Sequence, residues 1–203
     1  MSPLFRFSCI VLSAGDSGRM GTHKALLPFG DEKVTFLEKI TRQYANAGID
    51  QIIVVVNSDL YGLLETKRLD LPENLKLVIN ARPDLGRFHS LKTGLELITR
   101  ESAVFFQNVD NPFTEQSLIE LMSGEFGRAD VIIPLFEGRA GHPVLISPLV
   151  CSDICGCGNS SERIDHFLRR YTSCAIEANT PGVLSNINTQ TDYSIEFPGF
   201  WPG

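Results

Sequence analysis

The stretch Cys9–Gly30, CIVLSAGDSGRMGTHKALLPFG, decides the fold. It begins with apolar residues typical of a buried strand and continues into a loop of small residues, 13–18. Small residues let backbone N–H groups approach an anion closely. Arg19 can direct two N–H donors at phosphate oxygens, and Lys24 adds a mobile positive charge. The stretch therefore predicts a phosphate-binding turn at the end of the first strand.

Two common phosphate motifs do not account for this loop. The P-loop requires G-x4-G-K-[ST], and no Lys-Ser or Lys-Thr pair follows Gly15 and Gly18 in register. The dinucleotide fingerprint G-x-G-x-x-G fails because residues 16–18 break its spacing. An ordinary glycine turn is the alternative, and the two cations that follow favour an anion site over it.

Outward from this stretch, strand patterns alternate with helical patterns through the first two thirds of the chain. The β-branched run 51–56 is typical of a strand that is covered on both faces. This order predicts an α/β fold with a mostly parallel sheet, right-handed crossovers and helices on both faces. Ligands of such sheets bind at the carboxyl ends of the strands, so the motifs at those ends are expected to form one site.

The expected elements follow from these patterns. Strands are expected over 5–12, 51–56, 76–79, 103–109, 131–136, 143–146 and 173–178. Helices are expected over 35–46, 59–69, 90–99, 114–123 and 161–171, with Ser90 as the N-cap of the third.

Composition narrows the class of protein. The 203 residues suffice for one domain, 1–203, with 43% hydrophobic residues. A net charge of −6 argues against nucleic acid or an anionic membrane as a partner. No apolar run approaches the roughly 20 residues that span a bilayer, and the first residues do not resemble a signal peptide, so a cytoplasmic location is expected. The five cysteines are odd in number and lack zinc-ligand spacing, which favours free thiols over a metal site.

At this point the opening stretch resembles the signature of the MobA-like nucleotidyltransferases, L-[AS]-[AG]-G-x-S-x-R-M-G-x-x-K-x-L-L-P-x-x-G. Within that family the sequence is most similar to the molybdenum cofactor cytidylyltransferases. Three later segments extend the resemblance to roughly 8–193: 80–95, which is similar to N-x-x-[WY]-x-x-G-x-x-x-S-L-x-x-G-L; 109–112, similar to G-D-x-P; and 141–145, similar to G-H-P-V-L. The resemblance implies a Rossmann-like three-layer α/β/α nucleotidyltransferase fold with a mostly parallel mixed sheet.

The resemblance also implies site residues. Arg19, Lys24 and Asp110 are expected to be catalytic, and His142 is expected to position the substrate, although a histidine before proline is also a common loop residue. Asn57 is a weaker candidate for a nucleotide contact, with helix capping as the alternative. The expected nucleotide-binding residues are Leu12, Ser13, Ala14, Gly15, Arg19, Lys24, Asn80, Ser90 and Asp110.

A magnesium ion is the expected cofactor. Asp110 ends an apolar strand, near the phosphate loop, where a carboxylate is well placed to hold Mg²⁺; the alternative is an ordinary turn residue before Asn-Pro. The family's second acid lies in a stretch resembling D-I-D-T-P-E-D-Y, and here Asn186 and Asn188 replace the two leading acids. Asn188 can offer a carbonyl oxygen to the metal but no charge. Three alternatives stay open: Asp110 holds the metal together with substrate phosphates, the enzyme is slow, or transfer is lost.

The reaction expected from the resemblance is transfer of a nucleotidyl group from an NTP, CTP preferred, to a phosphorylated acceptor of the molybdopterin type. There are two alternatives. The enzyme could use another phosphorylated acceptor such as a sugar phosphate, or the chain could be a catalytically impaired protein that binds nucleotide. The aromatic end Phe197–Trp201 is expected to cover the acceptor ring, to pack on the domain or to contact a second copy. A monomer or a homodimer is expected.

Overall fold

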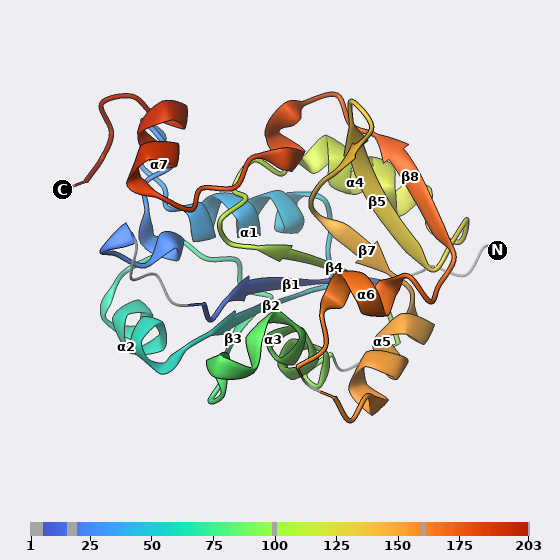
Figure 1. The fold of residues 1–203 in the computed structure, drawn as a ribbon. Coiled ribbons are helices and arrows are strands. Elements are labelled where there is room, and N and C mark those ends of the chain that lie inside the picture. The colour runs from blue at the N-terminus through green and yellow to red at the C-terminus, as the bar shows by residue number, and fades with distance from the viewer. Residues whose placement is uncertain (1–5, 16–19, 99–100, 160, 203) are drawn as a thin grey trace.

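The computed structural model describes residues 6–15, 20–98, 101–159 and 161–202. Its centre is one sheet in the order β3-β2-β1-β4-β7-β5-β6, with β8 paired to β5 (Figure 1). The strands are β1 Phe7–Ser13, β2 Gln51–Val56, β3 Leu75–Ile79, β4 Ala103–Asn108, β5 Val131–Phe136, β6 Arg139–Ala140, β7 Val144–Ile146 and β8 Ser173–Glu177.

The sheet is mostly parallel, as the sequence predicts. β1 pairs in parallel with β2 and β4, β2 with β3, and β5 with β8. β7 runs antiparallel between β4 and β5, and β6 is antiparallel to β5, which makes the sheet mixed. In register, Leu12 lies between Val55 and Asn108. The carboxyl ends of β1, β2 and β4 therefore meet at one edge of the sheet.

Helices cover both faces of the sheet, and β1 shows why. Its side chains alternate, so Cys9 and Val11 join one hydrophobic cluster while Ile10 and Leu12 join another. The first cluster includes residues of α1, α2 and α4, and the second includes residues of α3, α5 and α6. The helices are α1 Phe36–Asn46, α2 Ser58–Thr66, α3 Gly86–Leu95, α4 Gln116–Gly124, α5 Pro148–Gly156, α6 Ile164–Leu168 and α7 Gln190–Glu196, with 3-10 turns η2 Lys24–Leu26, η3 Pro83–Leu85 and η4 Pro181–Leu184.

Two expectations about helices are wrong, and two further helices were not expected. The third helix begins at Gly86, so Ser90 lies inside α3 and is not its N-cap. The helix expected over 161–171 is limited to α6. α5 and α7 were not expected, although each carries a sequence signal: Ser147 caps α5 ahead of a proline, and Thr189 caps α7. In the described residues no helix has the length and apolar character needed to cross a membrane.

Candidate active site

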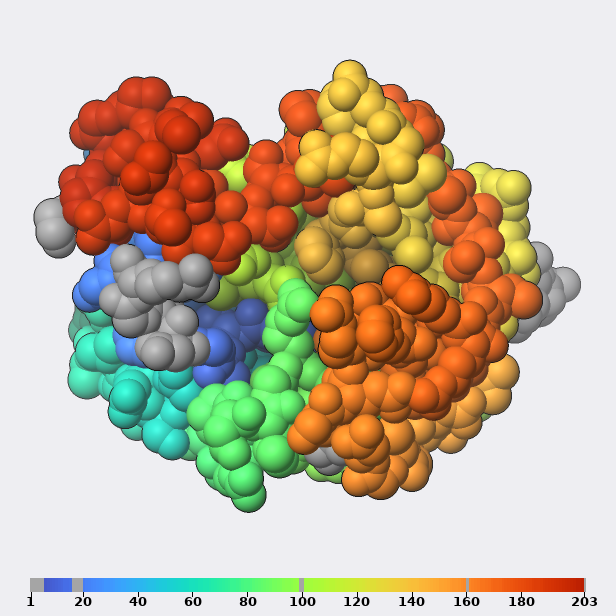
Figure 2. All heavy atoms as spheres, in the orientation of Figure 1, coloured from blue at the N-terminus to red at the C-terminus, as the bar shows by residue number. Residues whose placement is uncertain are grey.

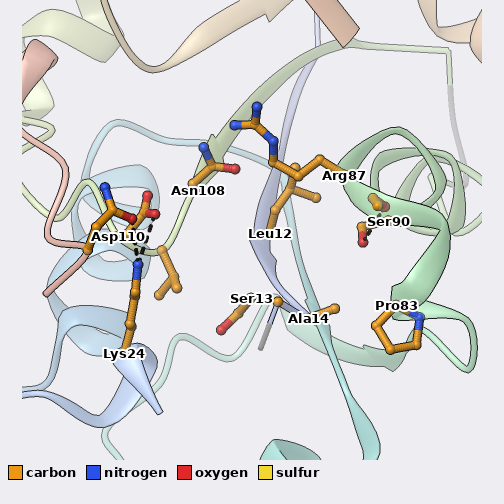
Figure 3. A pocket seen from close by; sticks show the side chains of 13 residues that line it. Leu12, Ser13, Ala14, Lys24, Pro83, Arg87, Ser90, Asn108 and Asp110 are labelled. Atoms are coloured by element: carbon orange, nitrogen blue, oxygen red, sulfur yellow. Dashed lines mark hydrogen bonds and ion pairs between the residues drawn. The ribbon is translucent and has the colours of Figure 1, made fainter. Parts of the chain in front are cut away.

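A polar cavity of about 340 Å³ opens at the carboxyl edge of β1 and β4. Figure 2 shows the molecular surface hollowed between the C-terminal segment and α3. Residues from five parts of the chain line the cavity: the end of β1, η2, the segment of η3 and α3, the end of β4 with the turn after it, and the segment before α7. Of the residues expected to form the site, it brings together Leu12, Ser13, Ala14, Gly15, Lys24, Ser90, Asp110 and Asn188 (Figure 3).

Lys24 connects the two residues expected to hold the metal. Its Nζ donates a hydrogen bond to Asn188 Oδ1 at 2.8 Å and lies 3.3 Å from Asp110 Oδ2. These contacts join residues that are 164 and 86 positions apart in the sequence. The lysine side chain is only 13% exposed and the aspartate 21%, so the pair is shielded from bulk water while it faces the cavity. Shielding strengthens the attraction between this pair and a charged ligand.

The donor set fits a divalent cation that is held by one carboxylate. Asp110 Oδ1 is buried and has no hydrogen-bond partner in the described residues, so it remains available as a ligand. Asn188 Oδ1 already accepts the lysine hydrogen bond. The described residues contain no group of three or more His, Cys, Asp or Glu side chains that could hold a metal alone. Mg²⁺ commonly takes one or two carboxylates together with substrate phosphates and water.

Asn186 does not share this position. It is exposed, does not line the cavity, and its Nδ2 donates to Leu184 O at 3.3 Å. Of the two asparagines that replace the acids of the family pattern, Asn188 is therefore the one at the site.

A set of backbone and side-chain hydrogen bonds brings Asn188 beside Asp110. The Ile187 N–H donates to Asp110 O at 2.8 Å, and the Asn111 side chain donates to Ser185 O at 2.6 Å. The Asp192 carboxylate accepts from the backbone N–H of Asn188 at 2.9 Å. This hydrogen bond is the largest cause lowering the pKa of Asp192. Asn111 and Asp192 thus fix the chain that carries Asn188.

A second cavity of about 540 Å³ adjoins the first. Arg87 and Asn108 line both cavities. Its apolar wall includes Phe106, Val131 and Ile133. Half of the lining residues are polar or charged, among them Arg163 and Arg169. An apolar wall combined with cationic side chains suits an organic ligand that carries an anionic group.

His142 lies in the second cavity and not in the first. Burial lowers the pKa of its imidazole, and Asp110 partly offsets this effect while Arg87 adds to it. Its Nδ1 is buried without a partner in the described residues. The backbone is held closely there: the His142 N–H donates to Val183 O at 2.9 Å, and a Cβ on Gly141 would lie 2.5 Å from the same oxygen. A neutral imidazole with a free ring nitrogen is suited to hydrogen bonding with a bound ligand.

Two expected contacts are placed differently, and a third is not described. Asn80 is 1% exposed and does not line the first cavity; its Nδ2 donates to Ser90 Oγ at 2.9 Å, so it positions Ser90. Asn57 caps α2, because its Oδ1 accepts from the Leu60 N–H at 2.9 Å. Arg19, expected to bind phosphate, lies outside the described residues.

Sequence reasoning did not single out Arg87 or Asn108. Asn108 could have been predicted, because it lies at the carboxyl end of β4, and polar residues at this edge of a parallel sheet contact ligands. Arg87 occupies a position that the family pattern leaves free, so only the geometry of α3 reveals it.

Together, the mostly parallel sheet and the cavity at its carboxyl edge define the class: an α/β protein of the doubly wound kind, which binds ligands where its strands end. Residues 9–174 match the MobA-like NTP transferase domain, and the chain belongs to this family. The resemblance seen in the opening stretch is thereby confirmed.

Relatives and solved structures agree with this assignment. Over 137 residues the chain is 29% identical to a probable molybdenum cofactor guanylyltransferase of Natranaerobius thermophilus; the match covers 65% of this chain and 62% of that protein. A homologue of Mycobacterium tuberculosis Rv0371c from Mycobacterium sp. strain JC1 is 27% identical with a TM-score of 0.75, and 94% of each chain is covered. A nucleotidyl transferase from Methanothermobacter thermautotrophicus shares the fold, with 22% identity, a TM-score of 0.73, and coverage of 93% of this chain and 94% of that one.

Proposed function

We propose that the protein transfers a nucleotidyl group from an NTP to a phosphorylated acceptor. The observation that carries the proposal is the pair of adjoining cavities, with Lys24 and Asp110 on the wall of the first. The first cavity takes the triphosphate, which the backbone of 13–15 and the Lys24 ammonium contact. The second cavity takes the acceptor. Family membership supports an NTP donor and a phosphorylated acceptor.

The transfer itself needs no covalent protein intermediate. An oxygen of the acceptor phosphate attacks the α-phosphorus, and a new P–O bond forms. The bond from the α-phosphorus to the α,β-bridging oxygen breaks, and pyrophosphate leaves with the electron pair. The acceptor oxygen is already ionised, so no general base is required. Lys24 stabilises the charge that develops on the leaving pyrophosphate, and catalysis is positioning plus electrostatics.

Asp110 is the residue that would hold Mg²⁺, through its unpartnered Oδ1. When bound, the ion supplies positive charge to the phosphate oxygens of the substrates. Asn188 contributes indirectly, because it holds the Lys24 ammonium beside Asp110. Of the three alternatives left open by the missing acids, we favour a metal held by Asp110 together with substrate phosphates.

We propose a molybdopterin-type acceptor for the second cavity. Its apolar wall suits a flat ring system, and His142 offers a neutral hydrogen-bonding nitrogen. The name of the Natranaerobius relative, a probable molybdenum cofactor guanylyltransferase, supports an acceptor of this kind. A sugar phosphate is the rival acceptor.

Two donors are candidates. CTP is favoured because the segments 90–95 and 141–145 resemble the cytidylyl branch of the family. GTP is the second candidate, because the relative of 29% identity is named as a guanylyltransferase.

A thermal-shift screen of CTP, GTP, ATP and UTP, each with and without Mg²⁺, would identify the donor and the metal requirement. A ligand that binds the native state raises the melting temperature by mass action. Pyrophosphate release on adding molybdopterin or a sugar phosphate would then identify the acceptor. Stabilisation by a nucleotide without pyrophosphate release from any pair would contradict the proposal and favour a binding protein that has lost transfer.

A further inference from the structure

Arg87 occupies the boundary between the two cavities. It is the second residue of α3, and it lines the first cavity together with Lys24 and the second together with His142. In Figure 3 the side chain extends from α3 into the cavity toward Asn108, while Lys24 enters from η2. The two cations therefore approach the space between them from different elements.

The guanidinium of Arg87 has no partner in the part of the chain that the structure describes, and the residue is exposed. Two other arginines near the cavities are paired: Arg82 with Asp84 at 2.7 Å, and Arg163 with Asp165 at 3.0 Å. Arg169 also has no partner in the described residues, but it lines only the second cavity, whereas Arg87 lines both. An unpaired guanidinium at a cavity wall keeps all its N–H donors available for a ligand. Its field already reaches the site, because it lowers the pKa of His142.

The charges around the site favour a further cation beside the bound substrates. Lys24 is already next to Asp110, so part of its charge is offset. Asn188 brings no second carboxylate, so a metal at this site would be held with less negative charge than the family pattern supplies. A triphosphate and a phosphorylated acceptor that meet here carry several negative charges, and their repulsion must be offset for the phosphates to approach each other.

We propose that Arg87 is a further catalytic residue, whose guanidinium contacts the α-phosphate of the nucleotide on one side and the acceptor phosphate on the other. This inference rests on the proposed nucleotidyl transfer. The planar fork of arginine can contact two oxyanions at once, which a lysine ammonium does less well. Arg87 thus draws the two reacting phosphates together and stabilises the charge shared between them during transfer.

The test compares Arg87→Ala and Arg87→Lys with the wild-type protein. We expect Arg87→Ala to lower kcat by roughly 10²- to 10³-fold, the usual effect of removing one donor to a developing charge. It also raises the KM of the acceptor and the Kd of CTP or GTP, while the melting temperature without ligand is unchanged. Arg87→Lys recovers part of the loss, because it keeps the charge but not the fork. Arg82→Ala removes the same charge nearby, from a residue outside both cavities, and should change kcat by less than about twofold.

Several results of this test would contradict the proposed role of Arg87. Wild-type kcat and acceptor KM in Arg87→Ala would overturn the inference while pyrophosphate release still upheld the proposed function. A weaker nucleotide Kd with an unchanged acceptor KM would overturn the bridging role. If the wild-type protein releases no pyrophosphate, the proposed function fails, and the Kd of CTP and GTP measured by calorimetry still decides whether Arg87 contacts phosphate. An equal Kd in wild type and Arg87→Ala, or no binding to either, would overturn that contact.

Discussion

The Lys24 side chain contacts both of the oxygen-bearing side chains at this site. Its ammonium lies between Asp110 Oδ2 and Asn188 Oδ1, and it leaves Asp110 Oδ1 without a partner in the described residues. The aspartate can therefore bind a cation with one oxygen while the other faces the lysine. A single lysine thus lines the cavity and contacts both oxygen-bearing side chains.

Removal of either charge should stop the reaction and leave the fold intact. We expect Lys24→Ala and Asp110→Ala each to reduce kcat by roughly 10²-fold or more, because each removes charge stabilisation from the transferred phosphate. Both side chains are partly exposed at a cavity wall, so circular dichroism should show an unchanged fold. Lys67→Ala is the control, since Lys67 is exposed at the end of α2 and lines neither cavity. Activity at the wild-type level in both Lys24→Ala and Asp110→Ala would show that neither residue takes part in the reaction.

Asn188 offers the opposite experiment, in which a charge is added. Asn188→Asp would place a second carboxylate beside Asp110, and affinity for hard cations rises with ligand charge. We expect the Mg²⁺ concentration for half-maximal activity to fall several-fold. The matched control is Asn186→Asp, which adds the same charge to the same segment at an exposed position outside the cavity. An equal response of the two variants would show that a carboxylate at position 188 does not act on the metal.

At the scale of elements, α3 is positioned by its close approach to the sheet. A Cβ on Gly94 would lie 2.8 Å from Ile10 Cγ2 and 3.1 Å from Val55 Cγ2. A contact that short forces the packing to shift, and Ile10 is β-branched and fully buried in β1, so it cannot move aside easily. Gly94 therefore lets the helix lie close enough to the sheet for its first turn, with Arg87, to reach the cavity.

Gly94→Ala should destabilise the protein, whereas the same change at Gly62 should stabilise it. Overpacking costs about 1–3 kcal/mol, which outweighs the helix-propensity gain of roughly 1 kcal/mol. Gly62 lies inside α2, and a Cβ added there would have no described atom within 4 Å, so Gly62→Ala keeps only the gain. Urea unfolding of the two variants would measure both free energies. A stabilised Gly94→Ala protein would contradict the packing argument.

At the scale of the whole molecule, the C-terminal segment holds the loop that carries Lys24. Tyr193 in α7 donates a hydrogen bond to Pro28 O at 2.8 Å, and a Cβ on Gly30 would lie 3.1 Å from the Phe197 ring. Phe197 packs against Phe29 with ring centroids 5.1 Å apart. The aromatic end lines neither cavity, so of the expectations for Phe197–Trp201, the structure favours packing on the domain over covering an acceptor ring.

Loss of the Phe197 ring should weaken both the fold and nucleotide binding. Phe197→Ala removes a buried aromatic side chain, which costs about 3–5 kcal/mol of unfolding free energy. We also expect the KM of the NTP to rise, because the segment that carries Lys24 loses a packing partner. Ile195→Ala is the control on the same helix, since Ile195 is 71% exposed. A destabilised variant with an unchanged KM for the NTP would show that the C-terminal segment does not affect nucleotide binding.

Much of the fold could be predicted because it rests on short-range patterns. Alternation along β1, the β-branched run of β2 and the order of strands and helices are local, and the mostly parallel sheet follows from them. The shared position of Ser13 and Asp110 could also be predicted, because both lie at or just after the carboxyl ends of strands in a parallel sheet, and they line one cavity with Lys24 of η2. The start of α3 could not, because Gly86 and a 3-10 turn begin the helix before the polar residue that resembles a cap.

The sequence alone therefore determined the first strand and the residues at its carboxyl end, because turn chemistry and side-chain period depend only on near neighbours. The tertiary structure alone decided that Asn188 lies at Lys24 while Asn186 faces away, and that Arg87 borders two cavities. Such contacts join distant segments, and their geometry depends on how helices pack on the sheet. Those packing distances are set by close contacts such as the one at Gly94, which no local pattern encodes.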